Sequence, residues 1–522
     1  MKKIIIISVL ISTSTYAKTT KNIDSEITKL LAHDPVITQV QEVVNQGLNR
    51  ASTAAQPWSG SYWPDITGSI TNHYRDRTKL WNQAFFALGY QVSKIRFMNN
   101  FEDVQKSYLG WDHSKLNEKL SPSEKYDLLV GNHDFNFTKA ILEELDFRAS
   151  HKPSFVSSNS SSTKDTEIDP DDNHESSRFS EDKRKNGFTV WRDSSSHYAY
   201  WSGICDGWSP ASIYLPRPVK PVTVKSFDGS PITFYPDDLK ALGSYLFART
   251  NTPYFASMQY SFAGQACREK GKPKLNHDGK VEDSACNDLD PGVWHLALVN
   301  RIGVDKTGFI MDVDNNVKIN NHPVFYYELE YFNPKTGKIG SLKDSIIARA
   351  EMRDSFENYR DPKAKSLVGV RSKVKMSFYI WAEDHHELTS DSVSEDKTKD
   401  EEYTYDLELD EDGKILGGEW GDRSNENGEK SRYAKQPDFI WMAPLHQLPY
   451  SQMSSSTIQG DYLNNKFEWA WDGKSTLPED WIAAAKEDQK WSPPVLNNQY
   501  SKLKSAQVLS NIIYKLFEMA KE

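Results

Sequence analysis

The segment WSGICDGWSPAS, residues 201–212, carries the clearest local signal in the chain. Glycines flank Cys205, and the AspGlyTrpSerPro that follows is typical of a helix start, with Pro210 in the first turn. A cysteine at a helix N-terminus lies at the positive end of the helix dipole, which favours the thiolate. We therefore expect a helix to begin near Cys205 and the pKa of this thiol to lie below its ordinary value.

Two more segments stand out downstream. GVWHLALVNRIG, residues 292–303, places His295 in a run of large apolar residues, which predicts a buried strand. TGFIMDVD, residues 307–314, places Asp312 after three apolar residues, at the end of a second strand. Taken singly, the histidine is more often a core residue and the aspartate a turn cap. In the order Cys, His and Asp, however, the three segments supply the nucleophile, base and orienting acid of thiol acyl transfer.

Both helices and strands are predicted along the rest of the chain. The loop QPWSGSYWPD, residues 56–65, is dense in aromatic residues that we expect to pack in the core. Ser154–Lys185 is rich in serine and charge and cannot bury enough apolar surface to fold, so it indicates a linker or an exposed loop. Periodicity predicts helices within 22–50 and 118–147 and at 236–248 and 503–521, strands at 322–333 and 374–382, and a hairpin over 403–420.

The composition is that of a globular protein. With 63 basic and 73 acidic residues among 522, the formal net charge is −10, and 38% of the residues are apolar. No segment gathers Lys and Arg on one face, which argues against a nucleic-acid partner.

The first 17 residues, MKKIIIISVLISTSTYA, are typical of a secretory signal peptide. A basic start precedes an apolar run, and small residues end at a plausible cleavage site after Ala17. The apolar run is shorter than the ~20 residues that a bilayer span needs. We therefore expect a secreted, extracellular protein with no membrane partner.

Three cysteines in an exported protein leave one unpaired. Cys267 and Cys286 are separated by a polar segment with an AsnHisAspGly turn, so we expect these two to form a disulfide. A loop of that size contributes about 3 kcal/mol in the chain-entropy account. Cys205 then stays free. Inert burial is the usual state of a lone cysteine, but the surroundings of Cys205 favour a nucleophile.

These segments together resemble the secreted transglutaminase elicitor family of oomycetes and marine bacteria, within the papain-like transglutaminase superfamily. In the oomycete proteins, the region that matches residues 319–328 carries a surface peptide that plants recognise. Four further pieces carry the resemblance: PWSGSYWP (57–64), LSPSEKYDLLVG (120–131), INNHPVFYYE (319–328), and LGGEW followed by QPDFIWMAP (416–420 and 436–444).

The resemblance implies an α+β fold with a papain-like, transglutaminase-type core, an N-terminal helical segment and a β-rich C-terminal part. It also implies a protein-glutamine γ-glutamyltransferase that joins glutamine to lysine side chains of protein substrates, or deamidates glutamine. Cys205 is then the nucleophile, His295 the general base and acid, and Asp312 the orienting carboxylate. Asp314 stands where the wider family often has Thr, and it competes with Asp312 for that role.

A tryptophan of the wider family helps to stabilise the oxyanion, and Trp191 and Trp201 are the candidates here. No cofactor is required by the sequence, and no metal ligand is assigned. Residues 312–316 begin like a calcium loop, but Val317 occupies the obligatory glycine position and no Glu closes the loop. Since some transglutaminases need calcium, the resemblance leaves calcium open as an activator.

Two other functions stay open. One is a papain-like cysteine protease, because peptide and side-chain amides need the same attack geometry. The other is a non-catalytic elicitor protein that a host recognises.

The chain is expected to have five parts. They are a signal peptide (1–17), an N-terminal helical segment and candidate pro-region (18–150), a linker or cleavage loop (151–187), a catalytic core with a β-rich extension (188–445), and a C-terminal segment that ends in an amphipathic helix (446–522).

Overall fold

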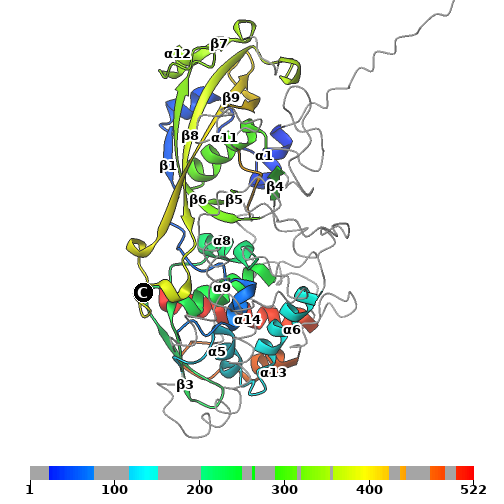
Figure 1. The fold of residues 1–522 in the computed structure, drawn as a ribbon, viewed down its shortest axis with the longest axis vertical. Coiled ribbons are helices and arrows are strands. Elements are labelled where there is room, and N and C mark those ends of the chain that lie inside the picture. The colour runs from blue at the N-terminus through cyan, green and yellow to red at the C-terminus, as the bar shows by residue number, and fades with distance from the viewer. Residues whose placement is uncertain are drawn as a thin grey trace, which may run out of the picture.

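A large curled antiparallel sheet and a layer of helices make up the fold (Figure 1). The mixture of helices and strands confirms the α+β expectation. The structure, a computed structural model, describes residues 23–75, 117–150, 202–249, 261–264, 289–313, 319–352, 357–421, 436–442, 471–487 and 501–521.

Nine of the described strands form the sheet, and every pairing between them is antiparallel. The main order is β10-β9-β8-β6-β5-β11-β4, while β1 pairs with β6 and β7 pairs with β8. The strands are β1 (Arg50–Ser52), β4 (Ser261–Gly264), β5 (Phe309–Asp312), β6 (Asn321–Phe332), β7 (Ile346–Ala348), β8 (Ser366–Phe378), β9 (Lys397–Leu409), β10 (Ile415–Trp420) and β11 (Phe439–Met442).

The N-terminal part of the chain is joined to this sheet by main-chain hydrogen bonds. After α1 (Ile23–Leu31) and α2 (Val40–Asn45), β1 pairs with the middle of β6. Ile415 N donates to Thr38 O at 3.0 Å, and Leu329 N donates to Asn49 O at 2.7 Å. Apolar side chains of α1 also pack in one core with the sheet strands and with α11 (Pro291–Ala297).

A second core lies among the helices drawn in the lower half of Figure 1. Trp58 and Trp63 of the aromatic loop are buried in it, as expected. The small hairpin of β2 (Val222–Lys225) and β3 (Pro231–Phe234) borders this core. Its helices are α5 (Pro122–Leu129), α6 (Asn136–Ser150), α8 (Cys205–Tyr214), α9 (Pro236–Arg249), α13 (Glu479–Glu487) and α14 (Ser501–Ala520).

Elements with their own end signals form where the sequence predicts them. In α5, the Ser121 hydroxyl accepts a hydrogen bond from Glu124 N, and the Glu124 carboxylate accepts one from Ser121 N, which is a capping box. Helices α9 and α14 and the β9–β10 hairpin match the predicted helices 236–248 and 503–521 and the predicted hairpin 403–420. The predicted strands 322–333 and 374–382 correspond to β6 and to the end of the longer β8.

The prediction that His295 lies on a strand is wrong. Residues 291–297 form α11, which continues as a π-helical segment, Leu298–Val304. The Asp290 side chain accepts a hydrogen bond from Gly292 N at 2.8 Å and caps this helix, and Pro291 follows at its first position. Every residue of α11 is buried, because α1, β9 and β10 pack against it. A mostly apolar, buried run in the sequence does not distinguish a helix from a strand.

Several predictions fall outside the described residues. They concern the signal peptide, the segment Ser154–Lys185, the Cys267–Cys286 disulfide, Asp314, and the tryptophans Trp191 and Trp201. Among the helices that are described, none combines the length and apolar character that crossing a membrane requires.

Cleavage within 151–187 should leave the two resulting pieces bound to each other. The N-terminal piece supplies side chains to both hydrophobic cores and hydrogen-bonds to the sheet, so its release would expose much of their apolar surface. After limited trypsin digestion, we expect two fragments on a denaturing gel and a single peak of unchanged mass in size-exclusion chromatography. An N-terminal fragment that elutes alone, with increased activity of the remainder, would instead support a pro-region.

Candidate functional site

Cys205 is the first residue of α8, as the sequence predicts, and its side chain is partly exposed. The aromatic loop holds the turn before it, because Ile204 N donates to Tyr62 O at 2.8 Å. Gly203 is required there, since a Cβ at this position would lie 2.5 Å from Tyr62 O. Because the helix starts at Cys205, Pro210 lies inside it rather than in its first turn.

The start of β6 brings polar groups to the thiol. Asn321 Nδ2 lies 3.7 Å from Cys205 Sγ, and the Ile319 carbonyl oxygen lies 3.8 Å from the same sulfur. One turn further along α8, the Ser209 hydroxyl donates to the Asn321 carbonyl oxygen at 2.8 Å. These contacts fix the helix N-terminus against the first residues of the strand.

Asp312 ends β5 beside this strand, directly across from Asn321 in the antiparallel register. It is fully buried, and its Oδ1 accepts a hydrogen bond from Asn320 N at 2.8 Å. Its charge acts on the thiol and helps to raise the pKa of Cys205. The structure therefore brings two of the three predicted residues, Cys205 and Asp312, into one site.

The amide of Asn321 is oriented by Trp441 of β11. The indole Nε1–H donates to Asn321 Oδ1 at 2.9 Å, which leaves the amide nitrogen directed at the sulfur. Sequence reasoning assigned no role to Asn321 or Trp441. Both nevertheless lie in segments that carried the family resemblance, 319–328 and 436–444, and that was the available signal.

His295 lies on α11, in the core that this helix forms with α1 and the sheet. None of the described contacts of Cys205 involves His295. Its ring is fully buried in α11, and its Nδ1 is 2.9 Å from the Tyr405 hydroxyl. Burial lowers the pKa of His295 to about 3, so the ring is neutral at physiological pH. None of the hydrogen bonds described for His295 involves Asp312.

A second buried histidine, His322, follows Asn321 on β6. Its Nδ1 donates to the Ser377 carbonyl oxygen at 3.1 Å, which places the proton of the neutral ring on that nitrogen. The ring stacks on Phe378, with centroids 4.7 Å apart, and meets the edge of Trp208 of α8. Burial is the main cause that lowers the pKa of His322 to about 4.

The expectation of a thiol with a lowered pKa is wrong for this arrangement. Burial raises the pKa of Cys205 to about 12, and the carboxylates of Asp206 and Asp312 raise it further, while hydrogen bonds from Asn321 lower it. The resting site therefore holds a protonated thiol at neutral pH.

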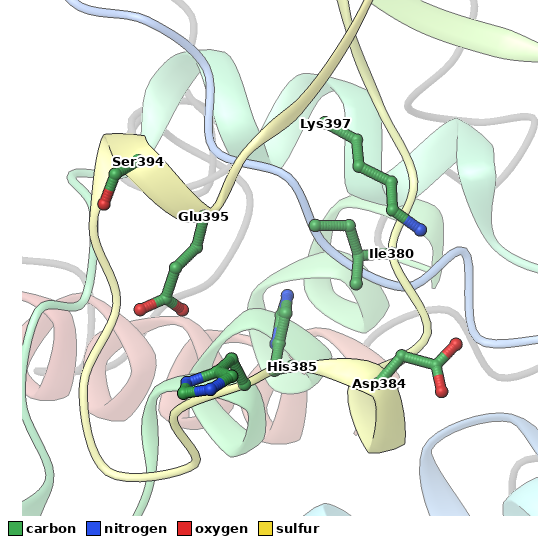
Figure 2. A pocket seen from close by; sticks show the side chains of 7 residues that line it. Ile380, Asp384, His385, Ser394, Glu395 and Lys397 are labelled. Atoms are coloured by element: carbon green, nitrogen blue, oxygen red, sulfur yellow. The ribbon is translucent and has the colours of Figure 1, made fainter.

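A pocket of about 450 Å³ lies elsewhere, between the end of β8 and the start of β9 (Figure 2). Its lining includes His385, whose Nδ1 is 2.6 Å from Asp237 Oδ2 at the start of α9. Within the described ranges, no three His, Cys, Asp or Glu side chains are arranged to hold a metal ion. The other lining residues are Ile380, Asp384, His386, Ser394, Glu395 and Lys397.

A comparison with models of protein families shows to which family the chain belongs. The model of the family described as "Transglutaminase elicitor" matches residues 107–458, which include Cys205, Asp312, Asn321 and Trp441. The chain belongs to the transglutaminase elicitor family.

Other comparisons are more distant. The chain is similar to the GP42 transglutaminase from Phytophthora sojae, known from a crystal structure, at 19% identity and a TM-score of 0.46. The similarity covers 82% of this chain and 92% of that one. No curated protein matches the chain.

Iodoacetamide should alkylate native Cys205 slowly at pH 8, and the rate should keep rising above pH 9. Only the thiolate reacts, and the pKa of the folded thiol is about 12 against an ordinary value of 9.0. Asp206→Asn removes one negative charge and should speed alkylation at pH 8 about three- to tenfold. Mass spectrometry of the Cys205 peptide gives the rates, and the urea-unfolded chain is the control. A rate that levels off below pH 9 in the folded protein would contradict the raised pKa.

Proposed function

We propose that this protein is a secreted protein-glutamine γ-glutamyltransferase. The observation that carries the proposal is the partly exposed thiol of Cys205 at the start of α8, held against Asn321 and beside Asp312, in a member of the transglutaminase elicitor family. Secretion rests on the signal-peptide pattern of residues 1–17.

The proposed reaction has two steps. The Cys205 sulfur attacks the side-chain amide carbon of a substrate glutamine, and ammonia leaves with the thiol proton, which produces a thioester. A lysine amine then attacks the thioester, and the thiol is regenerated as the isopeptide bond forms. Water in place of the amine yields glutamate.

The neighbours of the thiol suit this chemistry. The Asn321 amide N–H and the backbone N–H of Cys205 are the donors that we propose for the oxyanion of the tetrahedral intermediate. Helix α8 packs against β5 and β6, so we propose that these three elements correspond to the nucleophile helix and strands of a papain-like core. The helical setting of His295 departs from that pattern.

The general base is assigned from the resemblance to the family and not from a contact in the structure. We propose His295 for this role, with Asp312 as the acidic partner of the site. In the described arrangement the His295 ring pairs with Tyr405, and the thiol is protonated, so catalysis requires the base and the thiol to meet when substrate binds. His322, on the strand that contacts α8, is the competing candidate.

The position of 319–328 does not decide on the non-catalytic elicitor alternative. Residues 321–325 are buried in the sheet, whereas Ile319 and Glu328 are exposed, so a receptor could reach only the ends of the segment in the folded chain. The cysteine protease alternative uses the same nucleophile. It differs from the proposed function in its product, which is a cleaved peptide instead of an isopeptide.

Cys205→Ala should abolish incorporation of a fluorescent primary amine into casein while the melting temperature changes little, because the side chain is partly exposed and makes only weak contacts. The assay is run with and without a calcium chelator, and casein fragments are monitored on a gel. Full amine incorporation by Cys205→Ala would refute the proposal, and peptide cleavage without amine incorporation by the wild type would favour the protease.

His295→Gln should lower kcat for amine incorporation about 10²–10⁴-fold, as loss of a general base does. His322→Gln is the matched control, because both rings are buried, neutral and held through Nδ1. Melting temperatures are compared so that unfolding is not mistaken for lost catalysis. If His322→Gln is the crippling change, the base belongs to β6 and the assignment of His295 is wrong.

A further inference from the structure

Two exposed large apolar side chains belong to residues that are connected to the candidate nucleophile. Six such side chains are exposed among the described residues; of these, Ile319, at 39%, has its carbonyl oxygen beside the Cys205 sulfur, and Phe262, at 47%, stacks on Trp441. Single exposed apolar residues are ordinary, whereas exposed apolar groups beside a reactive group mark a binding surface. The other four are Val36, Phe227, Ile339 and Val393.

Ile319 adjoins the thiol through its own main chain. Its carbonyl oxygen is 3.8 Å from Cys205 Sγ, and two residues later Asn321 contacts the same sulfur. The exposed Ile319 side chain therefore belongs to a residue whose backbone borders the reacting atom.

Phe262 is connected to the thiol indirectly, through the side chains of Trp441 and Asn321. Its ring stacks on Trp441, with centroids 5.8 Å apart and planes 23° apart. Trp441 is buried, and its indole N–H holds Asn321, whose amide nitrogen lies 3.7 Å from Cys205 Sγ. The β11–β4 pairing sets Trp441 across from Phe262, so the stack is built into the sheet rather than into a loose surface group.

We propose that Phe262, stacked on Trp441, and Ile319 form an acyl-donor subsite that binds apolar side chains next to the reactive glutamine of a protein substrate. This inference rests on the proposed transglutaminase function. The donor is the occupant because it must contact Cys205 first to form the thioester. Ile319 borders the thiol, and Phe262 is linked to it through Trp441 and Asn321. Apolar rather than acidic neighbours of the glutamine fit, because the carboxylates of Asp206 and Asp312 already act on the site.

Two peptides of equal length and charge test the subsite, one with leucine on both sides of a single glutamine and one with serine there. Hydroxylamine serves as the common acceptor, and hydroxamate formation gives kcat/KM. The wild type should prefer the leucine peptide about tenfold or more. Phe262→Ser should remove most of that preference, because it should raise KM for the leucine peptide much more than KM for the serine peptide. Phe262→Leu, which keeps an apolar group, should retain most of the preference.

Phe227→Ser is the matched control, since Phe227 is exposed to a similar extent but lies in the turn between β2 and β3. It should leave the peptide preference unchanged. Equal kcat/KM values of the wild type for both peptides, or equal loss of the preference in the two serine variants, would overturn the subsite.

A binding measurement separates failure of the subsite from failure of the proposed function. The Cys205→Ala chain cannot turn over, and calorimetry reports its affinity for each peptide. Tighter binding of the leucine peptide that Phe262→Ser abolishes supports the subsite even if the wild type incorporates no amine. Equal affinity for both peptides overturns the subsite, whatever the outcome of the amine assay.

Discussion

The packing of α8 against the first residues of β6 is the constraint on which the candidate site depends. The Ser209 hydroxyl binds the Asn321 carbonyl oxygen, and one turn earlier the Cys205 sulfur meets the Asn321 side chain. On the opposite side, Gly207 allows α9 to approach so closely that a Cβ would lie 1.9 Å from Ser244 O. The helix is therefore held between the sheet and the helical layer, and the thiol cannot leave the strand without disturbing both.

Burial determines the resting chemistry of this site. Desolvation of the sulfur and the carboxylates of Asp206 and Asp312 favour the neutral thiol, and the opposing hydrogen bonds from Asn321 are too weak to reverse this. A protonated thiol is a poor nucleophile, so under the proposed function the thiol would react little with its surroundings before substrate binds.

The segment 319–328 has two roles: it borders the thiol, and it forms part of the sheet. Its first residues border the thiol and present Ile319 to solvent, whereas the following ones pair with β5 and β1 on one edge and with β8 on the other. Trp441 adds a hydrogen bond from a third strand. Because each residue here serves the site or the sheet, few substitutions are compatible with both.

Short-range patterns were sufficient for elements that carry their own end signals, such as the helix that starts at Cys205, α9 and the β9–β10 hairpin. They were insufficient for α11, because an apolar run surrounded by the core has no periodicity that separates helix from strand. The site itself was decided by tertiary structure. Asn321 is 116 residues from Cys205 and 120 residues from Trp441, so no local pattern could join them. The raised pKa of the thiol has the same origin, because desolvation and the charge of Asp312 arise only when β5 and β6 pack against α8.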